Sequence, residues 1–401
     1  MTAAERIDTN TAKTRAAEAI DSLDARLREI SLSLHKNPEL RFEEHHAHAL
    51  LTVFLEEQGF LVRRGAYDMP TAFEAITGSG HPVIAILCEY DALPGIGHAC
   101  GHNLIAIAGA AAAVGAKAGL GDGNGTLVVL GSPAEEGGGG KILLLERGAF
   151  QHVEAAMMVH PSTGDSPTFN STATQRYDVE YFGHNAHAGA SPWQGVNALD
   201  ALVAAYVNIS HMRQQLRPTE RVHGIFTKTG EAPNIIPDHT AGRWAIRASN
   251  MRHLEQLDAK IRACFEAAAL ATGCRVEITL GERPYANMVT NDVMAQAYID
   301  NLARLKHHIP PLDKARQPVG GATDMGNVSL VLPAIHPMVG IPTEAGGANH
   351  TPGFTAAAAT PGAHAAAIRA AKGLAFTALD LFLTEGTLAA ATAEFRKPGD
   401  R

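Results

Sequence analysis

The alternation of short apolar runs with helical stretches is the feature that most constrains how this chain can fold. The runs Val83–Leu87, Leu127–Leu130 and Ala155–Val159 have the length and composition of buried strands. Helical patterns at Ile105–Ala118 and Ile142–Arg147 lie between them. Since parallel strands need a crossover connection, usually a helix, this order predicts an α/β domain with a mainly parallel sheet covered by helices on both faces.

The middle of the chain follows a different pattern. Half-exposed strands and two amphipathic helices succeed one another in the order β-α-β-β-α-β, which is the ferredoxin-like unit. We therefore expect an inserted α+β domain at residues 172–285. The catalytic α/β domain then comprises residues 1–171 and 286–401.

The segments on either side of the insertion supply further elements. Helical patterns cover Ala12–Leu34 and Glu43–Gln58 before it. After it we expect a helix at Asp292–Leu305, a strand at Val331–Pro342 and a final Ala-rich helix.

Composition excludes several classes of protein. A chain of 401 residues with 46% hydrophobic and 18% charged residues is typical of a two-domain globular enzyme. Its net charge of −8 includes no Lys/Arg block, so we expect no nucleic-acid partner. No signal-peptide pattern or membrane-spanning run is evident, and four cysteines do not suggest a disulfide framework. We therefore expect a cytoplasmic protein without a membrane partner.

The loop after the first buried strand is rich in residues that bind metal ions. Thiolate, imidazole and carboxylate groups are the ligands of zinc and similar divalent ions, and loops at strand carboxyl ends are where α/β proteins place their chemistry. The candidates in this loop are Glu89, Asp91, His98, Cys100 and His102.

Three other strand ends carry residues of the same kind. Glu135 and Glu136 follow the second strand beside four glycines, His160 follows the third, and His350 follows the last expected strand. Of two adjacent carboxylates, one can bind metal while the other acts as a general base. Together these positions predict a two-metal hydrolytic site.

These residues lie in motifs that resemble the aminoacylase/carboxypeptidase-G family of two-metal metallopeptidases, which is metallopeptidase family twenty. The resemblance covers essentially the whole chain. Within the family, the chain resembles in particular the branch that contains aminobenzoyl-glutamate hydrolase and β-alanyl-lysine-type dipeptidase. The motifs are Leu34–Leu40, Glu89–Gly95, Gly97–Asn103, Pro133–Glu136, His160-Pro161, Gly183–Gly189, Asn234–Pro237 and Gly321–Asn327.

The resemblance implies two divalent metal ions per subunit, with zinc favoured and manganese or cobalt as alternatives. It implies Cys100 as the bridging ligand, Glu135 as the general base toward the attacking water, and Asp91 as a carboxylate that orients a ligand. The other implied ligands are His102, Glu136, His160 and His350. His98 is interpreted as structural.

In the inserted domain the resemblance implies further site residues. His187 would reach an active site across a homodimer and stabilise the tetrahedral oxyanion. Asn234 would contact substrate, and Arg247 would anchor a substrate carboxylate, with Arg243 almost equally placed. The inserted domain would thus serve as a lid and dimerisation domain.

The implied function is metal-dependent hydrolysis of an amide bond in a dipeptide or an N-acyl amino acid. An aminobenzoyl-glutamate-type carboxypeptidase, a Cys100-dependent nucleophilic amidase and a non-catalytic binding protein of the same fold are the alternatives. Two departures from many relatives, which carry Asp at the positions of Glu89 and Asn103, leave the role of Glu89 and the bound metal open.

Overall fold

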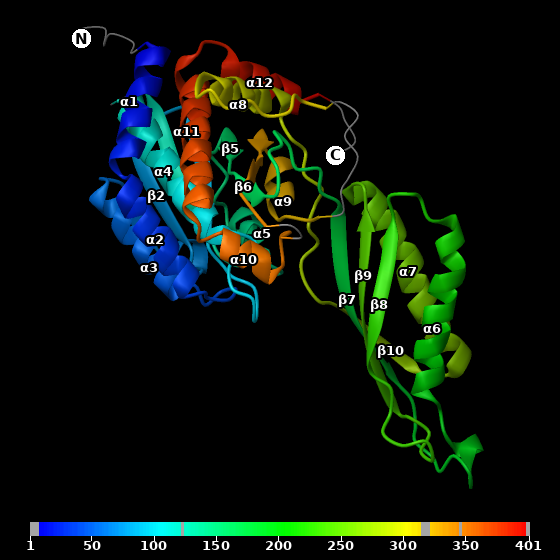
Figure 1. Cartoon of the computed structure of the whole chain (residues 1–401). Coiled ribbons are helices and arrows are strands. Elements are labelled where there is room, and N and C mark those ends of the chain that lie inside the picture. The colour runs from blue at the N-terminus through cyan, green and yellow to red at the C-terminus, as the bar shows by residue number, and fades with distance from the viewer. Residues whose placement is uncertain (1–7, 122–123, 314–320, 345–346, 398–401) are drawn as a thin grey trace. The chain divides into compact units, whose positions relative to one another are not determined.

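The structure, a computed structural model, describes residues 8–121, 124–313, 321–344 and 347–397. Within these ranges the chain forms two compact units (Figure 1). The second unit comprises Asn170–Asn287 and residues 321–326, and the remaining described residues form the first unit. Each unit has a hydrophobic core of its own.

The first unit is built on a six-stranded sheet in the order β1-β2-β4-β3-β5-β11. Its strands are β1 (Leu61–Arg64), β2 (Phe73–Ser79), β3 (Val83–Glu89), β4 (Gly125–Ser132), β5 (Ala155–Met157) and β11 (Ala334–Ile335). The strands β4, β3, β5 and β11 are parallel, whereas β2 and β1 add an antiparallel edge. Because both faces of β3 are buried, helices or loops must cover both sides. The prediction of a mainly parallel, covered sheet is confirmed.

Helices surround this sheet. They are α1 (Thr9–Ser22), α2 (Asp24–Lys36), α3 (His45–Glu57), α4 (His102–Leu120), α5 (Gly140–Glu146), α8 (Asp292–Arg304), α10 (Pro352–Ala357), α11 (Pro361–Leu383) and α12 (Thr387–Phe395), with a 3-10 turn at Ala66–Asp68. The short helix α9 (Met325–Ser329) begins with the last two residues of the second unit and ends in the first. Helix α4 packs on β3 and β4, and α1 and α11 pack on α4. A Cβ atom at Gly109 would lie 2.6 Å from the Leu87 carbonyl oxygen, so the small residues of α4 permit this close approach.

Helix α4 is also long and apolar enough to cross a membrane. Among the described residues, α11 and α12 pass the same test only as a pair bent by 96°. Of the most apolar window of α4, 89% is buried inside the protein, as expected for a core helix.

The second unit has the ferredoxin-like order that the sequence predicts. Its elements are β7 (Ala173–Phe182), α6 (Ala198–Met212), β8 (Arg221–Lys228), β9 (His239–Ala248), α7 (Met251–Thr272) and β10 (Arg275–Leu280), with 3-10 turns at Pro192–Gln194 and Arg213–Gln215. The strands pair antiparallel in the order β10-β7-β9-β8. The buried side chains of β7 and β9 share a core with α6 and α7, and alternate with exposed or half-buried charged residues.

Two predicted elements were wrong in extent. The helical pattern Ala12–Leu34 is two helices, because the backbone leaves the helical conformation at Leu23. The predicted strand Val331–Pro342 is interrupted around Pro337, which has no backbone N–H for a ladder, and yields β11 and β12 (Met338–Gly340). Strand β12 pairs with β6 (His160–Ser162) in a separate two-stranded sheet.

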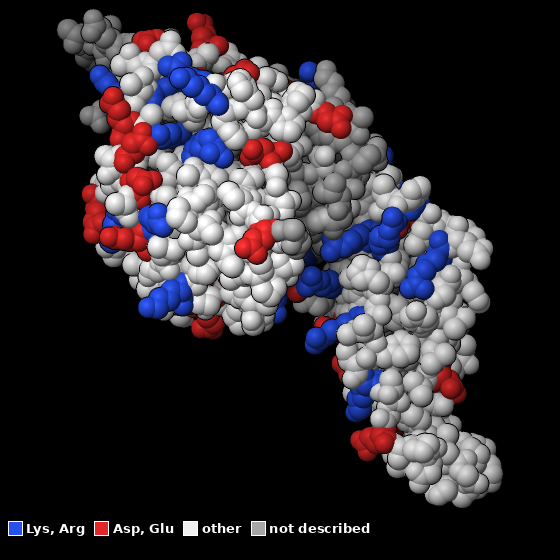
Figure 2. All heavy atoms as spheres, in the orientation of Figure 1, with Lys and Arg blue, Asp and Glu red and all other residues white. Residues whose placement is uncertain are grey.

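Charged side chains are mixed over the visible face of the first unit. Figure 2 shows Lys and Arg interspersed there with Asp and Glu, beside a broad area without charge. On that face the described residues form no large basic patch of the kind that binds phosphate backbones.

Candidate metal centre

The loop between β3 and α4 places a thiol and an imidazole side by side. Cys100 is 8% exposed, and His102, the first residue of α4, is fully buried. Gly101 between them has a φ of +76°, and a Cβ there would lie 2.9 Å from Cγ of Pro161. Only glycine suits this conformation and this space, which accounts for the Cys-Gly-His spacing.

The turn after β4 presents the two adjacent glutamates. Ala134 adopts the left-handed conformation, with a φ of +56°, immediately before Glu135 and Glu136. Glu135 is 7% exposed. The backbone N–H of Glu136 donates to Oδ2 of Asp91 at 2.9 Å, which ties this turn to the first loop.

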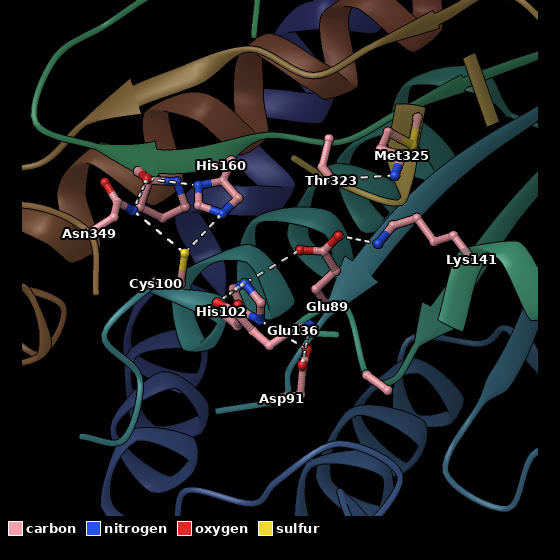
Figure 3. Close-up of polar contacts among 12 residues, drawn as sticks. Glu89, Asp91, Cys100, His102, Glu136, Lys141, His160, Thr323, Met325 and Asn349 are labelled. Carbon is pink, nitrogen blue, oxygen red and sulfur yellow. Dashed lines mark hydrogen bonds and ion pairs between the residues drawn. The ribbon is translucent and has the colours of Figure 1, made fainter. Parts of the chain in front are cut away.

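His160 stands at the start of β6. Its backbone N–H donates to the Pro337 carbonyl at 2.9 Å, and its Nδ1 donates to the Pro161 carbonyl at 2.8 Å. The second contact leaves Nε2 to face Cys100, whose Sγ is 3.4 Å away (Figure 3).

His350 comes from the loop before α10. Its φ of +67° is unusual for a residue with a side chain, and its backbone N–H donates to the Ala99 carbonyl at 2.8 Å. The imidazole Nε2 lies 3.3 Å from Oε1 of Glu136. The loop is thereby docked beside the Cys100 loop, and its histidine is directed at the second glutamate.

The side chains from these four loops meet in one cluster. Within the described residues of the first unit, three groups of potential ligand atoms each lie within 4.8 Å of one another. The groups are Cys100, His102 and His160; Cys100, Glu136 and His350; and His102, Glu135 and Glu136. The first two groups share Cys100, so the geometry offers two adjacent cation positions with one thiolate between them.

Asp91 orients His102 without joining the cluster. Its Oδ1 accepts from Nδ1 of His102 at 3.0 Å, so Nε2 is directed at the cluster, 4.0 Å from Oε1 of Glu136 (Figure 3). Burial works against the charge of Asp91, but His102, the backbone N–H of Glu136 and Lys141 together outweigh burial and lower the pKa of Asp91. This carboxylate–histidine arrangement is the one that fixes the ring and its tautomer at metal sites.

The electrostatics of the cluster favour a thiolate. Burial alone would raise the pKa of Cys100, but His160, His102 and His350 together outweigh it and the pKa falls well below its usual value. Contacts with Cys100 and Glu136 raise the pKa of His350 to about 10. Without metal, protons on the histidines thus balance the charge of Cys100 and Glu136, and cation binding would release these protons.

Two of the ligand atoms have no hydrogen bond to satisfy them. Nε2 of His102 and Oε1 of Glu136 are buried and lack a hydrogen-bond partner among the described residues. Because an unsatisfied buried polar atom costs about 1–3 kcal/mol, these atoms fit a site built to hold a cation. The mixed set of sulfur, nitrogen and carboxylate oxygen suits zinc and related ions.

Sequence reasoning missed a buried ion pair beside the cluster. Glu89 and Lys141 are both fully buried, and Nζ of Lys141 donates to Oε1 of Glu89 (Figure 3). The other oxygen of Glu89 has no hydrogen-bond partner among the described residues and lies 3.7 Å from Nε2 of His102. A single lysine immediately before the apolar run Ile142–Leu145 was the available signal.

His336 and Asn349 were also missed. The His336 ring is fully buried, with its centroid 5.4 Å from that of His160 and 5.3 Å from that of Phe169. Asn349 donates from Nδ2 to the Pro161 carbonyl at 3.1 Å and lies 3.7 Å from Sγ of Cys100. His98, interpreted as structural, donates from Nε2 to the Leu34 carbonyl and belongs to none of these ligand groups.

The other three predicted site residues belong to the second unit. His187 and Asn234 are exposed and lie on paired segments, since the N–H of Ala188 donates to the Asn234 carbonyl at 2.9 Å. Arg247 is half-buried on β9 and donates to Oγ1 of Thr172 at 3.4 Å.

The chain is similar to known proteins along most of its length. Residues 85–370 match the model of peptidase family M20/M25/M40. The Xaa-Arg dipeptidase of Mus musculus is 43% identical over 96% of this chain and 92% of its own length. One of the subunits of the p-aminobenzoyl-glutamate hydrolase of Escherichia coli (strain K12) is 28% identical over 96% of this chain and 94% of its own length.

The fold is shared with solved structures. A dinuclear metal-binding peptidase of the M20 family from Bacillus subtilis superposes with a TM-score of 0.67 at 21% identity, covering 90% of this chain and 99% of its own. The resemblance seen in the sequence motifs is therefore confirmed. The chain belongs to peptidase family M20/M25/M40 and is a metal-dependent hydrolase of amide bonds.

Proposed function

We propose that this chain is a two-metal dipeptidase whose ions share the thiolate of Cys100. The observation that carries the proposal is the pair of ligand groups that meet at this sulfur. One cation would be held with His102 and His160, and the other with Glu136 and His350. Zinc is our first choice for both ions, with manganese and cobalt as alternatives.

Glu135 would handle the protons of the reaction. When bound, the ions supply polarisation of the scissile carbonyl and a lowered pKa for the attacking water. Glu135 would accept the proton of that water and pass it to the nitrogen of the leaving amine. Its support is its position: it lies in one cluster with His102 and Glu136 and is next to a ligand in sequence. Asp91 would hold His102 in its binding orientation throughout.

His187 would stabilise the oxyanion that forms on the substrate carbonyl. Its Nδ1 accepts the backbone N–H groups of Gly189 and Ala190 at 3.2 and 3.1 Å. These contacts assign the proton to Nε2 in the neutral ring and leave that N–H available as a donor. Asn234, on the segment paired with His187, would contact the substrate from the same surface.

For the substrate we propose a dipeptide with a basic carboxy-terminal residue, since the relative at 43% identity is named Xaa-Arg dipeptidase. Arg247 would anchor the substrate carboxylate. The competing residue, Arg243, is exposed and forms an ion pair with Asp178 at 2.9 Å. Burial and Arg176 lower the pKa of Arg247, so an anionic group is favourable there.

A substrate panel with chelation controls tests the function. Protein loaded in turn with zinc, manganese and cobalt is given Xaa-Arg, Xaa-Lys, Xaa-Glu, aminobenzoyl-glutamate and N-acetyl amino acids. We expect turnover of Xaa-Arg and Xaa-Lys, its abolition by a chelator, and its return with one of the metals. Selective cleavage of aminobenzoyl-glutamate would instead favour the carboxypeptidase, and activity that survives complete metal removal would refute the two-metal site.

We further propose a homodimer formed through the second unit. Strand β8 is at the edge of its sheet and exposes Ile225 and Phe226, and α6 exposes Val203, Tyr206 and Val207. An edge strand with exposed apolar side chains is suited to pair with a second copy. Analytical ultracentrifugation should give a dimer that Ile225→Asp weakens, and a monomer at all concentrations would exclude it.

A cytoplasmic location is also part of the proposal. All four cysteines are free thiols in the structure, which suits a reducing compartment. Fractionation of the native cells with an antibody to this chain tests the location, and recovery from an oxidising compartment would contradict it.

A further inference from the structure

The segment Leu34–Glu44 has no part in the ligand groups, yet it contacts the loop that carries Cys100, the turn that carries Glu135, and helix α10, which follows the His350 loop. Its residues are bonded to segments that are far away in the sequence. The contacts are the Leu34 carbonyl with Nε2 of His98 (3.1 Å), Nε2 of His35 with the Thr355 carbonyl (2.7 Å), the Glu39 carbonyl with the N–H of Ala92 (2.8 Å), and Oε1 of Glu44 with the N–H of Ala134 (2.9 Å). The segment is therefore a brace for the metal-binding loops, and we call it the brace segment.

Glu44 is the member of the brace segment that contacts the turn carrying Glu135. Its side chain is completely buried, and Oε1 accepts two backbone N–H groups, from Phe42 at 2.8 Å and from Ala134 at 2.9 Å. Both donors lie on residues in the left-handed conformation, with φ values of +64° and +56°. Residues with a side chain rarely adopt this conformation, so their surroundings must hold it.

Two neighbouring residues bind the same turn. Arg41 donates from Nη1 to the Gly137 carbonyl at 3.1 Å. The Phe42 ring packs on Gly138, where a Cβ atom would lie 2.8 Å from Cε2 of the ring. The turn that carries Glu135 is thus held along its length by residues 41–44.

We propose that Glu44 is a positioning residue for the amide hydrolysis. By binding the N–H of Ala134, its carboxyl oxygen fixes the left-handed residue immediately before Glu135 and so directs Glu135 and Glu136 at the metal centre. This proposal rests on the proposed role of Glu135 as the general base. A displacement of about 1 Å in such a group can lower turnover by about a hundredfold, so a backbone contact at this position affects the rate.

The test compares Glu44→Ala with Glu44→Gln at saturating metal. The amide oxygen of glutamine can accept the same two N–H groups, so Glu44→Gln should keep kcat within about threefold. In Glu44→Ala we expect kcat to fall by about tenfold or more, with a smaller change in KM. Hydrogen exchange should accelerate in the peptide covering residues 133–139 in Glu44→Ala alone.

The matched control is Glu394→Ala. The Glu394 carboxylate also accepts two backbone N–H groups, those of Asp292 and Val293 at 2.8 and 2.9 Å, at the start of α8. Its loss should destabilise the protein while leaving kcat and the exchange of residues 133–139 unchanged. If Glu44→Ala does not fold, Glu44→Asp, whose carboxylate is one methylene shorter, takes its place with the same expectation.

The outcomes separate this inference from the proposed function. Equal kcat and equal exchange in Glu44→Ala and Glu394→Ala would overturn the positioning role. So would equal losses in Glu44→Ala and Glu44→Gln, because the oxygen acceptor is then not what matters. Glu135→Ala, measured in parallel, reports on the general base itself: if it stays active the proposed mechanism fails, whatever Glu44 does.

Discussion

The two units differ most in the polar groups that they bury. In the second unit, Nε1 of Trp244 is the single buried side-chain nitrogen or oxygen atom without a hydrogen-bond partner among the described residues. The described part of the first unit has many, and these atoms belong to Glu44, His48, Thr71, Glu89, His98, His102, Asn103, Ser132, Glu136, His336 and His364. Each such atom lowers the stability of the folded protein. Many of them lie around the loops of the metal centre, which indicates that these residues serve function and not stability.

The two sheets explain this difference. Strands β3 and β4 are parallel and buried, so their carboxyl ends open into loops whose polar residues lie beneath other chain segments. In the second unit the charged residues of β7 and β9 alternate with core residues and face outward. Arg243 and Asp178, for example, form an exposed pair.

The largest expected effect tests whether catalysis belongs to the first unit. Glu135→Ala should lower kcat by about two orders of magnitude or more, as expected for loss of a general base, with the metal content unchanged. Trp244→Phe, which removes the unpartnered atom of the second unit, should keep kcat. Steady-state kinetics and metal analysis measure both. If Trp244→Phe lowers kcat as much as Glu135→Ala does, catalysis does not depend on the first unit alone and the comparison between the units fails.

Much of this arrangement could be predicted from the sequence. Cys100, His102, Glu136, His160 and His350 were identifiable because each follows a strand, and parallel strands bring their ends to one edge. What the pattern lacked was contact information. A lysine in an apolar helix does not reveal that it faces Glu89, and a histidine inside an expected strand does not reveal that its ring stacks on His160.

Other errors came from limits of periodicity. The buried positions on both sides of Leu23 keep a helical spacing, so a one-residue break in the backbone leaves no trace in the pattern. Strand β1 is four residues long and largely exposed, with the sequence Leu-Val-Arg-Arg, and offers no apolar signal. Short edge strands of this kind are recognised only from their pairing partner.

The next prediction concerns the free energy of unfolding, and tests how much of it depends on the ion pair between Lys141 and Glu89 that is buried in the first unit. Lys141→Met should cost about 3–5 kcal/mol, because it leaves the buried Glu89 carboxylate without its charged partner. The double variant Lys141→Met/Glu89→Gln should recover much of the loss, since no buried charge then remains. Urea unfolding measures both, and a single variant within about 1 kcal/mol of the wild type would contradict the prediction.

Glu44 should make the stability of the first unit depend on pH. Burial, reinforced by the charge of Asp91, raises the pKa of Glu44 from 4.5 to about 7. Between these values the folded protein binds more protons than the unfolded chain, so the stability contributed by Glu44 falls as the pH rises through this window. Because glutamine does not ionise, Glu44→Gln should be about 1–3 kcal/mol more stable relative to wild type at pH 8 than at pH 5. Equal differences at the two pH values would refute the shift.

The smallest effect sharpens the comparison inside the second unit, where two arginines share β9. Arg243→Ala removes an exposed ion pair with Asp178, so we expect a stability change within about 0.5 kcal/mol and an unchanged KM. Arg247→Ala, at the half-buried position beside Thr172, should raise KM about tenfold or more for a substrate with a free carboxylate. Of these two arginines on one strand, we thus expect the half-buried Arg247 to bind substrate and the exposed Arg243 to have little effect. If instead Arg243→Ala raises KM and Arg247→Ala does not, the carboxylate is bound by the exposed residue, and partial burial is a poor guide to the binding site in this unit.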